Sequence, residues 1–210
     1  EKVVVITGAT SGIGRRTAEV CVEQGAKVVV SGRRQTEGQN VADSLGESAI
    51  YVKADVAKEE EVQNLIQISK NTFGQIDCLF NNAGIPGNAG GLDTLETDQI
   101  NTELSVLING VLYGMKHVSP IMKQQGHGSI INTGSIAGQR AGYGVSLVYS
   151  IAKAAVIHAS KCAAMELAEH KIRVNSLSPG AIVTGIFGKA FGLSDEQSDS
   201  EGATDHLLER

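Results

Sequence analysis

Short apolar runs alternate with longer segments of helical periodicity along most of the chain. Several of the runs, such as KVVVITG at residues 2–8 and KVVVSG at 27–32, are apolar at consecutive positions. Strands buried on both faces show this pattern, because parallel sheets carry helices on each side. Further strands are predicted over 49–55, 77–84, 128–135 and 172–180, and helices over 13–24, 36–45, 58–73, 98–124 and 149–169.

This alternation predicts an α/β fold with a doubly wound, mostly parallel sheet that has helices on both faces. The chain shows no internal repeat and no linker, so residues 1–210 are expected to form a single domain. The pattern fades after Pro179, and residues 185–210 are expected to be a mobile substrate loop, because many of them are polar and acidic.

Composition and charge exclude several classes of function. The net charge of −5 argues against nucleic acid as the main partner, because duplex binding requires a basic surface. The longest apolar runs are too short for a membrane span, and no signal peptide opens the chain. Cys21, Cys78 and Cys162 fit neither a disulfide framework nor a zinc site, so we expect no metal and a reducing, cytoplasmic location.

A glycine-rich segment, TGATSGIG at residues 7–14, directly follows the first predicted strand. Glycine permits positive φ and lets phosphate oxygens approach the backbone. The N-terminus of the following helix offers N–H donors to a pyrophosphate. The alternative is a glycine-rich turn that binds nothing, but the strand–turn–helix context favours a nucleotide site.

The end of the second strand indicates which nucleotide binds. It reads SGRR at residues 31–34, and the next acid is Glu37. NAD-dependent sites usually offer an acid there to the ribose 2′-hydroxyl, whereas an arginine suits a 2′-phosphate. We therefore favour NADP(H) over NAD(H), the alternative being that Arg33 and Arg34 are solvated surface charges.

Six motifs in this order resemble those of the short-chain dehydrogenase/reductase family, over residues 2 to about 187. They are TGATSGIG (7–14), Asp55 after the third strand, NNAG (81–84), the serine of NTGSIAG (132–138), YSIAK (149–153) and SPGAIVT (178–184). The resemblance implies a Rossmann fold and an oxidoreductase that transfers a hydride between a nicotinamide cofactor and a secondary alcohol or ketone. It also implies a homo-oligomer.

The same resemblance implies which residues hold the cofactor. Asp55 and Val56 are expected near the adenine, and a cap on the next helix is the alternative for Asp55. Thr184 and the backbone of Ile182 are expected at the nicotinamide carboxamide. The full expected set is Gly8, Thr10, Ser11, Gly12, Ile13, Gly14, Arg33, Arg34, Asp55, Val56, Asn81, Ala83, Gly84, Tyr149, Lys153, Pro179, Gly180, Ile182 and Thr184.

Three residues are expected to be catalytic. Tyr149 and Lys153 lie four positions apart, on one face of a predicted helix, although such a pair can also be a plain surface pair. The phenol has a pKa of about 10, and a neighbouring ammonium is expected to lower it, so the resemblance makes Tyr149 the general acid/base. Ser135 follows the fifth strand, where its hydroxyl can donate to the substrate oxygen. Nearby hydroxyls expected to be structural are Ser129, Thr133 and Ser146.

The chain departs from the family pattern within the helix predicted over 98–124. Family members usually carry an asparagine three residues before a glycine, and this asparagine holds a water next to the active-site lysine. Counting back from Gly110 places Leu107 in that slot, whereas Asn109 lies one residue before the glycine. Positions two apart on a helix differ by about 200°, so Asn109 is expected to face away unless a helix bulge moves it.

The family's final helix and strand are expected to be absent, since nothing in 185–210 resembles them. This absence and Leu107 favour, slightly, the alternative of a non-catalytic nucleotide-binding scaffold. An epimerase or dehydratase is a further, less favoured alternative. Apolar candidates for the pocket wall indicate a mainly apolar substrate, and they are Ile85, Ile136, Ala137, Tyr143, Ile182, Phe187 and Phe191.

Overall fold

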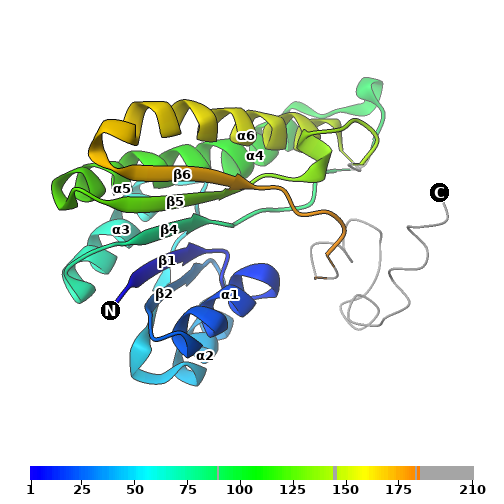
Figure 1. Cartoon of the computed structure of the whole chain (residues 1–210). Coiled ribbons are helices and arrows are strands. Elements are labelled where there is room, and N and C mark those ends of the chain that lie inside the picture. The colour runs from blue at the N-terminus through cyan, green and yellow to red at the C-terminus, as the bar shows by residue number, and fades with distance from the viewer. Residues whose placement is uncertain (89, 144–145, 183, 185–210) are drawn as a thin grey trace.

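The computed structural model describes residues 1–88, 90–143, 146–182 and 184, and it contains one sheet of six parallel strands (Figure 1). The strand order is β3-β2-β1-β4-β5-β6. The doubly wound parallel sheet that the sequence predicts is thereby confirmed. The bounds are β1 Val3–Thr7, β2 Lys27–Gly32, β3 Ala49–Lys53, β4 Cys78–Asn81, β5 Gly128–Thr133 and β6 Ile172–Leu177.

Helices cover both faces of the sheet. α1 and α2 pack on one face, whereas α3, α5 and α6 pack on the other (Figure 1). None of the helices in the described part of the chain has the length and apolar composition that a membrane crossing requires. The bounds are α1 Gly12–Glu23, α2 Gln35–Ser44, α3 Glu59–Phe73, α4 Thr97–Leu104, α5 Gly110–Gln125 and α6 Leu147–Leu167.

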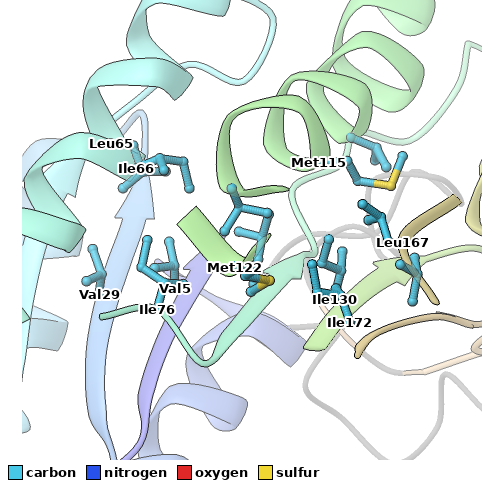
Figure 2. Close-up of a cluster of buried hydrophobic side chains, with 14 of the residues drawn as sticks. Val5, Val29, Leu65, Ile66, Ile76, Met115, Met122, Ile130, Leu167 and Ile172 are labelled. Carbon is cyan, nitrogen blue, oxygen red and sulfur yellow. The ribbon is translucent and has the colours of Figure 1, made fainter. Parts of the chain in front are cut away.

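Two apolar clusters hold these layers together. β1 is buried at all five positions, so its alternate side chains enter different clusters. Val5 packs with Leu65 of α3 and Met122 of α5, while Ile6 packs with residues of α1 and α2. Figure 2 shows the first cluster, in which strand side chains meet Met115 and Met122. Each buried aliphatic side chain contributes roughly 1.5–3 kcal/mol, so consecutive apolar positions stabilise both interfaces of a strand.

The helix predicted over 98–124 is interrupted. A π-helical turn, Ser105–Asn109, separates α4 from α5. Such a turn adds one residue to the helical repeat and rotates the residues on either side by about 100° relative to an unbroken helix. The local bulge that the sequence alone does not require is therefore present. Within it Leu107 is fully buried, and Asn109 is half-buried.

A buried carboxylate closes the amino edge of the sheet, where the strands begin. Asp77, directly before β4, is 7% exposed. It accepts hydrogen bonds from Lys2 Nζ at 2.8 Å, from the N–H of Val3 at 2.9 Å and from Gln75 Nε2 at 2.7 Å. The Nε2 atom of His127, directly before β5, lies 3.3 Å away. One carboxylate thus links the starts of three neighbouring strands.

Residues 185–210 lie outside the described residues. The mobile substrate loop expected there, together with the expected absence of a final helix and strand, therefore stays a prediction. Phe187 and Phe191, two candidates for the pocket wall, also lie outside the described part of the chain.

Candidate active site

The candidate site lies at the carboxyl edge of the sheet, opposite the Asp77 cluster. The loops that follow β1 to β6 all begin there, because every strand runs in the same direction. Doubly wound sheets bind their ligands in the crevice along this edge. The fold therefore brings segments that are spread over residues 8–184 to one side of the molecule.

The glycine loop between β1 and α1 has the geometry of a phosphate-binding turn. Gly8 and Gly12 have φ values of 66° and 55°, which L side chains rarely adopt. A Cβ on Gly14 would lie only 2.4 Å from the carbonyl oxygen of Gly8. Ser11 precedes the first turn of α1, and its side chain does not cap that helix. The N–H groups of this turn thus have no side-chain partner from Ser11.

Asn82, which the sequence did not single out, ties the glycine loop to the NNAG segment. Its Nδ2 donates to the carbonyl oxygens of Thr7 and Gly8, at 3.1 and 3.2 Å. The backbone N–H groups of Asn82 and Ala83 donate to the hydroxyl of Thr7, at 3.0 and 3.1 Å. The only sequence signal for this role is the place of Asn82 in NNAG, which does not say which way the amide points.

The side chain of Asn81 points into the sheet rather than toward the site. Asn81 is 3% exposed, and its Nδ2 donates to Oδ1 of Asn132 at 2.9 Å. A Cβ on Gly114 would lie 2.2 Å from Oδ1 of Asn81, so α5 packs closely on this amide. The Asn81 side chain therefore supports the sheet, and only its backbone belongs to the candidate site.

Asp55 and Val56 lie at the end of β3, in the region expected to meet the adenine. Oδ1 of Asp55 accepts a hydrogen bond from the N–H of Ala57 at 3.1 Å, which closes a turn before α3. The residue that caps α3 is Lys58, so Asp55 is not the helix cap considered as its alternative role. Val56 packs against Gly110, where a Cβ would lie 2.8 Å from the valine side chain.

Two arginines lie on the rim of the glycine loop. Arg34 Nη2 donates to the hydroxyls of Thr10 and Ser11, at 2.9 and 3.0 Å. Its other contact, with the exposed Glu37 at 3.7 Å, is long for an ion pair. Arg33 is exposed and forms no hydrogen bond or ion pair with the described residues. The rim therefore carries positive charge in a position that can meet an anion.

Ser135, Tyr149 and Lys153 come together after β5 and at the start of α6, at the carboxyl edge of the sheet. Ser135 is 8% exposed, and its Oγ accepts a hydrogen bond from the N–H of Ala137 at 3.1 Å. Tyr149 lies in the first turn of α6, and Lys153 lies one turn later. The Nζ atom of Lys153 is 5.5 Å from the centroid of the Tyr149 ring and donates to the carbonyl oxygen of Thr133 at 2.7 Å.

Burial dominates the titration of this group. It raises the pKa of Tyr149 above the ordinary value, and the adjacent Ser135 hydroxyl opposes this shift only in part. Burial also lowers the pKa of Lys153 to about 8. The expectation that the Lys153 ammonium favours the Tyr149 phenolate stays a prediction, since burial and the Ser135 hydroxyl account for the direction of the Tyr149 pKa here.

The segment after β6 lies against two other parts of the site. The carbonyl oxygen of Pro179 accepts a hydrogen bond at 3.1 Å from the N–H of Ile136, in the turn after β5. A Cβ on Gly12 would lie 3.4 Å from the side chain of Thr184, which places Thr184 over the glycine loop. Gly180 and Ile182, between these contacts, are exposed.

The apolar residues expected to line the pocket differ in their burial and surroundings within the described structure. Ile85 packs against the small cluster of Val56, Val62 and Val106, near α3. Tyr143 is 59% exposed, whereas Ala137 is buried. The sequence-based expectation of an apolar pocket therefore receives no direct support from these side chains.

The residues present fit a dinucleotide. Besides the glycine loop and the arginine rim, two buried hydroxyls at the carboxyl ends of strands, Ser31 Oγ and Thr133 Oγ1, have no hydrogen-bond partner within the described structure. Buried polar groups are normally satisfied, so such atoms mark places where a ligand or water can bind. No group of three or more His, Cys, Asp or Glu side chains in the described part is placed to hold a metal ion.

Comparison with known proteins is consistent with this site. A family model described as short chain dehydrogenase matches residues 2–192. The chain is 38% identical over 213 residues to "Short-chain dehydrogenase reductase ATA1" of Arabidopsis thaliana, covering 100% of this chain and 77% of the relative. It is 39% identical over 188 residues to "Tropinone reductase-like 2" of Erythroxylum coca, covering 88% of this chain and 68% of the relative.

Solved structures share the fold. A 3-ketoacyl-(acyl-carrier-protein) reductase from Brucella melitensis, complexed with NADH, superposes with a TM-score of 0.85 at 29% identity, over 96% of this chain and 94% of that chain. A short-chain type dehydrogenase/reductase from Mycobacterium marinum superposes with a TM-score of 0.86 at 33% identity, over 91% of this chain and 77% of that chain.

Proposed function

Because the chain belongs to the short-chain dehydrogenase/reductase family, and is thus an NAD(P)-dependent oxidoreductase, we propose that it interconverts a secondary alcohol and a ketone. The observation that carries the proposal is the grouping of Ser135, Tyr149 and Lys153 at the carboxyl edge of the sheet, the edge that also carries the glycine loop. A bound nicotinamide dinucleotide supplies or accepts the hydride. The protein then has to orient the substrate oxygen and move one proton.

Each of the three side chains has a distinct role in this proposal. In the reductive direction the Tyr149 hydroxyl gives its proton to the carbonyl oxygen as the carbonyl carbon becomes bonded to hydrogen. The Ser135 hydroxyl donates a hydrogen bond to the same oxygen, where negative charge develops. The Lys153 ammonium, 5.5 Å from the centroid of the phenol ring, favours the phenolate that remains. Oxidation of an alcohol reverses these steps.

The protonated Tyr149 hydroxyl suits the role of the acid in the reductive direction. Burial raises the pKa of Tyr149, which keeps the phenol protonated near neutral pH. A protonated phenol is ready to act as an acid toward a ketone, but it must first lose its proton to act as a base toward an alcohol. Relatives named for tropinone and 3-ketoacyl reduction support a carbonyl compound as the substrate class.

We infer a preference for NADP(H) over NAD(H) from the arginine rim. Arg33 and Arg34 follow β2, where an acid would suit the ribose 2′-hydroxyl, and Arg34 is held against the loop hydroxyls. The relative from Brucella melitensis is complexed with NADH, so the family accepts either nucleotide. A direct test compares kcat/KM for NADPH and NADH with one carbonyl substrate. A homo-oligomer stays a prediction from the family resemblance, and a cytoplasmic location stays a prediction from the cysteine pattern.

The proposed reaction is tested with a panel of ketones, aldehydes and secondary alcohols, following nucleotide absorbance. Tyr149→Phe removes one hydroxyl and should lower turnover by about 10³-fold. Tyr113→Phe, a half-buried tyrosine on α5, is the matched control and should keep the parent rate. Parent activity in Tyr149→Phe would contradict the role given to the phenol. Nucleotide binding without turnover across the panel would favour the scaffold alternative.

A further inference from the structure

Glu103 of α4 is a buried carboxylate outside the catalytic group. It is 1% exposed. Oε1 accepts hydrogen bonds from the backbone N–H and from Nδ2 of Asn88, at 2.8 and 3.1 Å. Oε2 accepts a hydrogen bond from the hydroxyl of Ser146 at 3.1 Å. No lysine, arginine or histidine in the described part of the chain pairs with Glu103, so its burial needs another explanation.

The start of α6 supplies that explanation. Ser146 is the N-cap of this 21-residue helix, and its Oγ accepts a hydrogen bond from the N–H of Tyr149 at 3.2 Å. The serine hydroxyl therefore accepts from the helix and donates to Glu103. Negative charge is favourable near a helix N-terminus, because the N–H groups there carry partial positive charge. The carboxylate is thus stabilised by the helix that it helps to cap.

Tyr149 depends on this cap more than any later residue of α6. It lies in the first turn, where N–H groups have no partner within the helix. Lys153 lies one turn further along, where helical hydrogen bonds are complete. Loss of the cap should loosen the backbone that carries the phenol while leaving the lysine in place.

The loop after β4 belongs to the same unit. A Cβ on Gly87 would lie 2.2 Å from Cβ of Ser146 and 2.8 Å from Cβ of Tyr149, so this loop packs directly on the first turn of α6. The next residue, Asn88, donates to Glu103 from both its backbone N–H and its side-chain amide. Glu103 therefore fastens a loop and a helix terminus to each other at the position of the phenol.

We propose, on the premise that Tyr149 is the general acid/base as inferred above, that Glu103 is a positioning residue for it. Glu103 acts through Ser146 and Asn88, and it does not touch the reacting atoms. Its carboxylate holds the first turn of α6 and the segment that packs on it, so that the phenol keeps one orientation toward the substrate oxygen. Small displacements of a catalytic group have large effects on rate, and this makes the anchor functional.

The test uses the full chain with Glu103→Gln, Ser146→Ala and the double variant. Hydrogen exchange of peptides over 146–153, without nucleotide, reports the helix end directly and needs no substrate. Turnover and KM are then measured with a carbonyl compound from the panel. Asp98→Asn removes an exposed acid from the same helix, and Asp77→Asn alters a buried carboxylate at the opposite edge. Both serve as controls.

Glu103→Gln and Ser146→Ala should each speed exchange over 146–153 and lower kcat by about tenfold, with little change in KM. The double variant should be no slower than Glu103→Gln, because both changes break one chain of hydrogen bonds. Asp98→Asn and Asp77→Asn should leave exchange over 146–153 and kcat unchanged. If Glu103→Gln does not fold, Ser146→Ala alone carries the test, since it removes a single hydroxyl.

Parent-like exchange and kcat in Glu103→Gln and Ser146→Ala would overturn the positioning role. The same holds if Asp77→Asn lowers kcat as much as Glu103→Gln does, because the effect would then follow general stability. These outcomes are distinct from failure of the proposed function, which Tyr149→Phe reports. If Tyr149→Phe is fully active, the exchange arm still shows whether Glu103 anchors the helix end.

Discussion

The amino edge and the carboxyl edge of the sheet treat buried polar groups differently. At the amino edge Asp77 accepts hydrogen bonds from Lys2, Val3 and Gln75, and the His127 ring also contacts its carboxylate. At the carboxyl edge the hydroxyls of Ser31 and Thr133 have no partner within the described structure.

The difference follows from what each edge has to do. Groups that are satisfied by the protein itself contribute stability, whereas groups left free can bond to a ligand. Lys153 shows the consequence most clearly, because it is 3% exposed yet donates to only one described acceptor, the Thr133 carbonyl. Substitutions at the two edges should therefore separate turnover from stability.

The largest separation is expected along β5, which has a serine near each end. Ser135→Ala removes the donor to the substrate oxygen and should lower kcat by about 10²-fold or more. Its Oγ also caps a short turn, so stability should fall by about 1 kcal/mol at most. Ser129→Ala, at the amino end of the same strand, should leave kcat unchanged. Equal losses of kcat in the two variants would remove the distinction between the edges.

At the amino edge the expected loss is of stability. Asp77→Ala leaves the buried Val3 N–H and the half-buried Gln75 amide without their acceptor, and should lower the free energy of unfolding by about 1–3 kcal/mol. Turnover measured well below the melting temperature should match the parent. Denaturant unfolding gives the first quantity and steady-state kinetics the second. A fall in kcat at a temperature where Asp77→Ala is fully folded would show that the amino edge also controls the site.

Asp77 at the amino edge should also contribute to the loss of stability at acid pH. Burial raises the pKa of Asp77, but the hydrogen bonds from Lys2, the Val3 N–H and His127 together outweigh it, so the pKa lies below its ordinary value. A depressed carboxyl pKa stabilises the fold above the unfolded pKa of about 3.9, and this contribution is lost as pH falls through the folded pKa. The melting temperature should fall less between neutral and acid pH in Asp77→Asn than in the parent.

At the carboxyl edge the buried ammonium of Lys153 should lower the stability of the fold. The pKa of Lys153 is about 8 in the fold and about 10.4 in an unfolded chain. Between these values the unfolded chain binds more protons, so stability without nucleotide rises with pH there and is lowest below about pH 8. Lys153→Met should therefore abolish turnover yet stabilise the protein at neutral pH by about 2 kcal/mol. Lys161→Met, exposed on the same helix, should do neither, and a lower melting temperature for Lys153→Met would contradict the assignment.

The sequence predicts the frame of the site better than its details. Short β-branched runs place the strands, and several of these runs are apolar at consecutive positions. The β-α alternation then makes the strands parallel, so the edge that carries the site is predictable. Hydrogen bonds between distant segments cannot be predicted from the sequence in this way. Nothing in the local pattern shows that the Asn82 side chain points to the glycine loop while the Asn81 side chain points into the sheet. Glu103 gave no distinct sequence signal, because it lies in the mostly polar segment TDQINTEL and its partners lie 15 and 43 residues away.

The π-helical turn was also beyond the local pattern. Periodicity predicts one continuous α-helix through Leu107 and Asn109, whereas the structure has the π-helical turn Ser105–Asn109 between α4 and α5. Leu107 is nevertheless fully buried and lies near Gly84, where a Cβ would be 3.6 Å from its side chain. The slot that family members fill with asparagine is therefore still apolar next to the NNAG segment, and the role of Asn109 stays a prediction.

The smallest expected effect concerns the rim of the carboxyl edge, where charge is exposed to solvent. Arg33 forms no hydrogen bond or ion pair with the described residues, so Arg33→Ala should weaken NADPH binding by about tenfold and leave NADH binding unchanged. Arg34 also holds the hydroxyls of Thr10 and Ser11, so Arg34→Ala should weaken the binding of both nucleotides. Arg16→Ala, on the exposed face of α1, is the control.

Salt should reduce the effect of Arg33→Ala on NADPH binding, because exposed charges are screened. Fluorescence titration at two ionic strengths measures these quantities. If the NADPH-to-NADH preference does not change in Arg33→Ala, the exposed rim charge does not set the nucleotide preference.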